Sequence, residues 1–147
     1  MIKQVSVTEA HDLQQHGHVY VDVRSSAEFA AGHPAGAYNV PLLESGPFGR
    51  LAPNPDFLRV ISGSFASDTK LLMGCQVGGR SQRAAEILLS HGFTDVANVR
   101  GGFAGTRDPM SGRVVDPGWV ESGLPVEDGQ PDDRSYRTLS NRAGTQA

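Results

Sequence analysis

Residues 70–92, KLLMGCQVGGRSQRAAEILLSHG, contain the pattern from which the fold class follows. The apolar run at 70–74 predicts a buried strand, the glycine-containing segment 75–79 predicts a turn, and 80–91 predicts a helix with one apolar face. The chain's single cysteine, Cys75, is therefore expected between the carboxyl end of a strand and the amino end of a helix.

The same alternation of short apolar runs and helical segments extends over most of the chain. We expect further strands at 19–23, 37–40 and 96–99, helices at 8–16, 25–32 and 56–65, a loop at 42–55 and a short helix at 119–122. Thr8 is expected to cap the first of these helices, and Ser25 with Glu28 forms a capping-box pattern for the second. Together the segments predict an α/β domain, with a central, mainly parallel sheet flanked by helices on both faces.

The 147 residues are enough for one domain, which we place at residues 1–127, with a polar insertion at about 104–117. From residue 128 to 147 the chain is polar and has no hydrophobic period, which predicts a disordered tail. The formal net charge is −3 and charges of both signs are mixed, which argues against nucleic acid as a partner. No segment has the apolar length of a secretory signal or a membrane span, so the expected location is the cytoplasm.

A lone cysteine can form neither an intramolecular disulfide nor a cysteine zinc site. His11, His16 and His18 are close in sequence, but such a group is more often a solvated helix end than a metal site. We therefore expect neither a metal nor an organic cofactor. Two uses remain for Cys75, which are burial as a small apolar side chain or reactivity as a thiolate.

The segment after Cys75 favours reactivity. Its backbone N–H groups from Gln76 through Val77, Gly78, Gly79 and Arg80 to Ser81 can point into the turn, and the following helix adds the positive end of its dipole. Gly78 and Gly79 allow the backbone to curl tightly, and Arg80 adds a positive charge. Such a site stabilises an anion, so Cys75 is predicted to be a nucleophile and residues 76–81 to bind its substrate. Ser81 has no base beside it and is expected to support the loop.

Several motifs around this segment resemble those of the rhodanese family, in particular the single-domain rhodaneses of the plant senescence-associated type and their bacterial relatives. The resemblance extends from Val5 to about Val126. Besides 75–81, it rests on Asp22-Val23-Arg24 with Glu28-Phe29, on the segment 32–41, in which Pro34 replaces the usual aliphatic residue, on Asn54-Pro55-Asp56-Phe57, and on Gly101-Gly102-Phe103, Gly118-Trp119 and Gly123-Leu124-Pro125-Val126.

The resemblance implies a thiosulfate sulfurtransferase. Cys75 would take a sulfane sulfur from thiosulfate or a similar donor as a persulfide and pass it to cyanide or to a thiol, with thioredoxin or glutathione as candidate acceptors. Arg80 would help to bind the donor. Asp22 and Arg24 would lie beside the active face, but for Arg24 we favour a structural role, in which it pairs with Glu28 across one helical turn. His33 would orient a loop through a backbone hydrogen bond.

Three alternatives remain open. A cysteine phosphatase or an arsenate reductase needs five residues between cysteine and arginine to surround a tetrahedral anion, whereas Cys75 and Arg80 are separated by four, and Gly74 replaces the histidine that commonly precedes a phosphatase cysteine. A rhodanese fold can also be a binding module without turnover. Finally, the chain could be a persulfide carrier for one specific acceptor.

Overall fold

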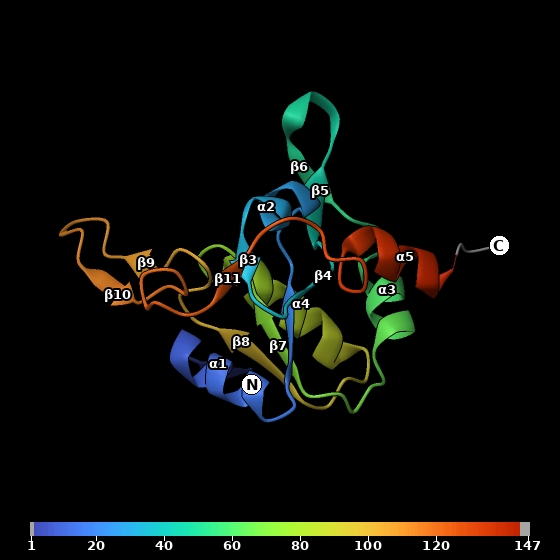
Figure 1. Ribbon diagram of the computed structural model, residues 1–147, viewed down its shortest axis with the longest axis horizontal. Helices are drawn as coiled ribbons and strands as arrows, with labels where there is room; N and C mark the ends of the chain where they lie inside the picture. The colour runs from blue at the N-terminus through green and yellow to red at the C-terminus, as the bar shows by residue number, and fades with distance from the viewer. Residues whose placement is uncertain (1, 145–147) are drawn as a thin grey trace.

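A sheet of five parallel strands forms the centre of the domain (Figure 1). The computed structural model describes residues 2–144. The strands lie in the order β1-β8-β7-β2-β4, so β7 is central. Their bounds are β1 Lys3–Val5, β2 Val19–Asp22, β4 Tyr38–Asn39, β7 Leu71–Gly74 and β8 Val96–Val99. This sheet confirms the predicted α/β class, to which the structure adds the edge strand β1.

Helices cover both faces of the sheet, and each face has its own apolar core. Helices α1 (Val7–Gln15) and α2 (Ser26–Ala31) contribute to one core, while α3 (Phe57–Ser64), α4 (Gly79–Ser90) and α5 (Tyr136–Ala143) contribute to the other. The pleat explains the division, since successive side chains of a strand point to opposite faces. In β7, Leu71 and Met73 join the α3–α4–α5 core, and Leu72 joins the opposite one.

Capping boxes begin the two helices that follow β1 and β2. The Ser25 hydroxyl accepts from Glu28 N–H, and the Glu28 carboxylate accepts from Ser25 N–H, as the sequence pattern predicts. The first helix begins two residues earlier than expected, because Ser6 and Glu9 form the same reciprocal pair. The prediction of Thr8 as the cap is therefore wrong.

Between residues 2 and 144, three two-stranded ribbons lie outside the central sheet. The segment predicted as a loop at 42–55 contains a hairpin of β5 (Leu43–Ser45) and β6 (Leu51–Pro53), joined through η1 (Pro47–Gly49). The polar insertion forms a second hairpin of β9 (Thr106–Arg107) and β10 (Val114–Asp116). Strand β3 (His33–Pro34) pairs antiparallel with β11 (Val126–Glu127). Figure 1 shows the β5–β6 and β9–β10 hairpins projecting from the domain in different directions.

The tail expected to be disordered from residue 128 contains α5, so that expectation is wrong for residues 136–143 (Figure 1). Leu139 is buried in the core beside α3, and the Tyr136 hydroxyl meets the side chain of Asn54. A Cβ placed on Gly63 of α3 would lie 2.8 Å from that of Ala143, so the two helices pack closely. The buried Leu139 of α5 and the close approach of α5 to Gly63 of α3 therefore hold the tail on the domain, although the tail itself is mostly polar. Residues 145–147 of the predicted tail lie outside the described residues.

The short helix predicted at 119–122 is also absent, since these residues form hydrogen-bonded turns. Trp119 lies in the core, where its indole N–H donates to the carbonyl of Pro125 at 2.7 Å. Within residues 2–144, no helix has both the length and the apolar character needed to cross a bilayer.

Candidate active site

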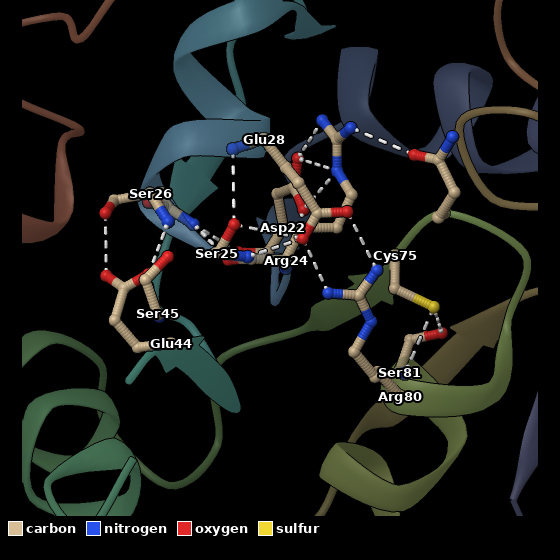
Figure 2. A network of polar contacts seen from close by, with 12 residues as sticks. Asp22, Arg24, Ser25, Ser26, Glu28, Glu44, Ser45, Cys75, Arg80 and Ser81 are labelled. Carbon is tan, nitrogen blue, oxygen red and sulfur yellow. Dashed lines mark hydrogen bonds and ion pairs between the residues drawn. The ribbon is translucent and has the colours of Figure 1, made fainter. Parts of the chain in front are cut away.

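Cys75 follows directly after β7, and its sulfur faces the first turn of α4 (Figure 2). The N–H groups of Gly78 and Ser81 donate to Sγ at 3.1 and 3.4 Å, and the Ser81 hydroxyl lies 3.3 Å from it. Only 2% of Cys75 is exposed. The residue thus combines burial with hydrogen-bond donors around the sulfur.

Glycines shape the loop that surrounds the sulfur. Gly78 has φ +108°, a left-handed conformation that places its N–H toward Sγ and that residues with a side chain rarely adopt. The turn after β8 is hydrogen-bonded to this loop, because Phe103 N–H and Ala104 N–H donate to the carbonyls of Cys75 and Gln76. A Cβ on Gly102 would come within 2.4 Å of the Cys75 carbonyl oxygen, so the two segments touch backbone to backbone.

A chain of polar side chains leads away from the sulfur through Ser81. The Ser81 hydroxyl lies 2.6 Å from Oδ1 of Asn98 on β8. The Asn98 amide in turn donates to Oε1 of Gln4 at 2.8 Å, and the Gln4 amide donates to Gln82 at 2.7 Å. Ser81 and Asn98 are both buried, so these hydrogen bonds are shielded from water.

Arg80 forms a bidentate ion pair with Glu28 of α2. Nη1 and Nη2 donate to the two carboxylate oxygens at 2.7 and 3.0 Å (Figure 2). Hydrogen bonds from Arg80 lower the pKa of Glu28 to about 2 despite partial burial, and those bonds also raise the pKa of Arg80. The pair therefore joins the beginning of α4 to α2, and it engages the guanidinium that the sequence analysis assigned to the donor.

Arg24 pairs with Asp22, and its expected bond to Glu28 is replaced by this contact. Its guanidinium donates to the Asp22 carboxylate at 2.7 Å and to the carbonyl of Gly32 at 2.6 Å, and the pair is almost fully buried. Nη1 reaches Oε1 of Gln76 at 3.1 Å, and the ring of Phe103 lies 4.5 Å from the guanidinium carbon. Arg24 thus holds the side chain that follows Cys75.

His33 serves the packing of α2 and the β3–β11 ribbon. One ring nitrogen lies 2.6 Å from the carbonyl of Phe29, whose ring stacks on the imidazole, and the other lies 3.1 Å from Glu127. The carboxylate of Glu127 also accepts from Arg134 and from Gly36 N–H. These partners make His33 a structural residue of this ribbon.

A pocket of about 280 Å³ opens beside the Cys75 loop. Its wall is formed by Arg24, Glu28, Ala31, Gly32, Gln76 and Phe103. A larger and more apolar hollow of about 350 Å³ lies between the β5–β6 hairpin, α3 and α4. The smaller pocket is the better candidate for the substrate, because Gln76 and one member of each ion pair of the site, Arg24 and Glu28, border it.

The structure brings Cys75, Gly78, Arg80 and Ser81 into one cluster, with Gln76 attached through Arg24. Val77 turns outward and is 51% exposed. The N–H groups that contact Sγ are those of Gly78 and Ser81, a smaller set than the predicted run from Gln76 to Ser81. Arg24, paired with Asp22, contacts Gln76 beside this cluster, and His33 belongs to the β3–β11 ribbon.

Sequence reasoning missed three residues of the site. Asn98 and Phe103 arrive from β8 and the turn after it, and Glu28 from α2. Glu28 and Phe103 entered only as parts of the family motifs, with Glu28 also assigned to a capping box and to a bond with Arg24, and Asn98 stands in an otherwise apolar strand. The signal that could have identified Asn98 is an amide side chain within an apolar strand, because a buried amide needs hydrogen-bond partners.

Comparison with known proteins identifies the family. Residues 6–108 match the rhodanese-like domain. The chain is 42% identical over 123 residues to "Thiosulfate sulfurtransferase 16, chloroplastic" of Arabidopsis thaliana, with 84% of this chain and 91% of that protein covered. It is 37% identical to "Senescence-associated protein DIN1" of Raphanus sativus, covering 84% of this chain and 60% of that protein.

Among solved structures, the crystal structure of Rv0390 from M. tuberculosis superposes with a TM-score of 0.70 at 27% identity, covering 86% of this chain and 98% of the other. The residues that match the rhodanese-like domain include the Cys75 loop. The relatives support sulfur transfer at the level of the family, and the chain belongs to the rhodanese family.

Proposed function

We propose that this chain is a sulfurtransferase that carries sulfur as a persulfide on Cys75. The observation that supports it most is the placement of Sγ, which accepts two backbone N–H donors at the beginning of α4. Donors in this position stabilise a thiolate, and they remain in place while charge develops on a neighbouring sulfur atom. The sulfurtransferase name of the Arabidopsis relative agrees with this chemistry.

The first half of the reaction loads the enzyme. The Cys75 thiolate attacks the sulfane sulfur of thiosulfate, the S–S bond of the donor breaks, and sulfite leaves with the bonding electron pair. The charge of the thiolate then resides on the outer sulfur of the persulfide. In the second half, cyanide or a thiolate attacks that outer sulfur, and the electron pair of the broken S–S bond returns to Sγ. The proposed kinetics are therefore ping-pong.

Arg80 and Glu28 hold the loop in this scheme, and Arg24 and Gln76 border the pocket through which donor and acceptor enter. Thiosulfate is the proposed donor, and glutathione or thioredoxin is a candidate acceptor for a thiol-dependent second half. None of these steps requires a metal ion or an organic cofactor.

Intact-mass measurement after incubation with thiosulfate tests the proposal. We expect a gain of one sulfur atom, about 32 Da, that cyanide removes as thiocyanate. The matched control is Cys75→Ser, which should gain no sulfur and form no thiocyanate. An unmodified wild-type mass at saturating thiosulfate, together with no thiocyanate, would instead favour a rhodanese-fold binding module. Hydrolysis of phosphate esters that is lost in Cys75→Ser would favour a phosphatase.

A further inference from the structure

We infer that the Ser81 hydroxyl is a switchable hydrogen-bond donor to the Cys75 sulfur, and that Asn98 is the positioning residue that accepts its proton when the sulfur does not. This inference deepens the proposed sulfur transfer and rests on it for its role in turnover. Its structural basis is the juxtaposition of one hydroxyl with three acceptors, of which Asn98 is the nearest and the Cys75 sulfur is the one whose charge changes.

The Ser81 hydroxyl has a single proton and three acceptors around it. Oδ1 of Asn98 lies at 2.6 Å, the carbonyl of Gly78 at 3.2 Å and Sγ of Cys75 at 3.3 Å. The shortest of these contacts is the one with Asn98, so we assign the hydroxyl proton to Asn98 in the state in which a neutral thiol can donate its own proton to the Ser81 oxygen. Cys75 and Ser81 then form a continuous donor chain that ends on Asn98.

Gln4 and Gln82 keep the Asn98 amide in the orientation that this chain needs. The NH₂ group of Asn98 donates to Gln4, and the NH₂ group of Gln4 donates to Gln82. The NH₂ groups of Asn98 and Gln4 therefore both point away from the sulfur and toward the surface. The carbonyl oxygen of Asn98 is left facing Ser81, where it can only accept.

Ionisation of the Cys75 thiol changes the direction in which the Ser81 hydroxyl donates. When the Cys75 proton passes to solvent, Sγ becomes an acceptor only, and its charge makes it a stronger one than a neutral amide oxygen. A rotation of the Ser81 hydroxyl about its C–O bond then moves the proton from Asn98 to Sγ. The sulfur gains a third donor, besides the N–H groups of Gly78 and Ser81, that is present only in the charged state.

The switch suits both halves of sulfur transfer. The hydroxyl can return to Asn98 as the thiolate attacks, because the charge leaves Sγ for the outer sulfur. When an acceptor removes that sulfur, the electron pair returns to Sγ, and the hydroxyl can turn back to stabilise the leaving thiolate. Ser81 thus follows the charge on Sγ, and Asn98 gives the buried hydroxyl a closer acceptor than the Gly78 carbonyl in between.

The alkylation rate of Cys75 by iodoacetamide, measured from pH 5 to 10, tests the inference without any sulfur transfer. The pH midpoint of this rate reports the thiol–thiolate equilibrium. In Ser81→Ala we expect the midpoint to rise by about one pH unit, a tenfold change in that equilibrium, because the thiolate loses a donor. In Asn98→Ala we expect it to fall, because the hydroxyl loses its competing acceptor.

The opposite directions separate the switch from a structural effect, since loosening of the loop would move both variants the same way. Ser90→Ala is the matched control on α4, where the hydroxyl bonds only locally, and its midpoint should be that of the wild type. Asn98→Leu keeps the buried volume without an acceptor and replaces Asn98→Ala if that variant unfolds. The Arg80–Glu28 and Arg24–Asp22 pairs and the buried Tyr20 hydroxyl, the other charged or titratable groups around Cys75, are unchanged in all these variants.

An unchanged midpoint in Ser81→Ala, or a rise in both Asn98 variants, would overturn the inference. Single-turnover measurements add the link to function. In Ser81→Ala, release of sulfur from the persulfide to cyanide should slow several-fold more than loading from thiosulfate at pH 10. Shifted midpoints in a protein that never loads sulfur would reject the proposed function alone, and normal loading with unshifted midpoints would reject the switch alone.

Discussion

The hydroxyl of Tyr20 occupies the space beside Gly74 in which any larger residue would place its side chain. A Cβ on Gly74 would lie 1.9 Å from the Tyr20 hydroxyl oxygen and 2.4 Å from the ring carbon that carries it. Tyr20 is fully buried on β2, and that burial raises its pKa well above the usual value. A neutral phenol therefore backs the residue that precedes Cys75, and a histidine at position 74 has no room in this fold.

The first prediction follows from that contact. Gly74→Ala should lower the free energy of unfolding by about 1–3 kcal/mol, because the added methyl group displaces a buried ring. Gly79→Ala is the control, since nothing lies within 4 Å of its Cβ position and its φ is ordinary. Urea denaturation of both variants measures the difference, and equal midpoints would contradict the close contact with Tyr20.

A second prediction concerns the pH dependence of the Arg80–Glu28 pair. The pKa of Glu28 falls to about 2 in the folded protein, below its ordinary value of 4.5, so the pair's contribution to stability is complete above pH 4.5 and is lost as the pH falls through 2. Glu28→Gln should keep the cap on Ser25, since glutamine also serves in a capping box. We expect its melting temperature to lie below the wild type at pH 7, with the difference closing between pH 4.5 and 2.

One result would contradict this prediction for Glu28→Gln. If thermal melts of wild type and Glu28→Gln differ by the same amount at pH 7 and at the lowest pH that preserves the fold, the charge of Glu28 makes no contribution. The partial exposure of both side chains keeps the expected difference small, because water screens the pair.

A third prediction separates a loop clamp from a donor-binding site at Arg80. Both Nη atoms are bound to Glu28, so we expect Arg80→Ala and Glu28→Gln to lower kcat/KM for thiosulfate by similar factors. The double variant should be about as impaired as either single variant, because both changes remove one interaction. Steady-state kinetics of the three proteins measures this. A higher KM in Arg80→Ala with a lower one in Glu28→Gln would instead assign Arg80 to the donor.

A fourth prediction addresses the C-terminal helix. Leu139→Ala should destabilise the protein by about 2 kcal/mol or more, because a buried leucine on α5 packs against the core beside α3. Arg137→Ala on the exposed side of the same helix is the control. Urea denaturation, with limited proteolysis of residues 128–135 as a second readout, decides the matter. Equal stability of the two variants would mean that α5 contributes nothing to the domain.

Local features of the sequence were enough to predict the strand–loop–helix unit around Cys75 and the position of the cysteine within it. The apolar run before Cys75, the glycines after it and the capping box at Ser25 act over a few residues, so their consequences follow from the residues themselves. The chain's α/β class follows in the same way, because it depends on the order of such units along the sequence.

Only the tertiary structure decided which distant side chains meet the unit. Arg80 bonds to Glu28 across 52 positions, Asn98 reaches Ser81 across 17, and α5 docks beside Gly63 from a segment with almost no apolar content. Such contacts depend on the order of strands in the sheet and on which side chain fills a given space. The sequence by itself therefore determined that the chain's single cysteine stands between a strand and a helix. Three-dimensional packing decided which groups hold the loop after Cys75 and which amide meets the hydroxyl beside its sulfur, because these contacts join residues that are distant in sequence.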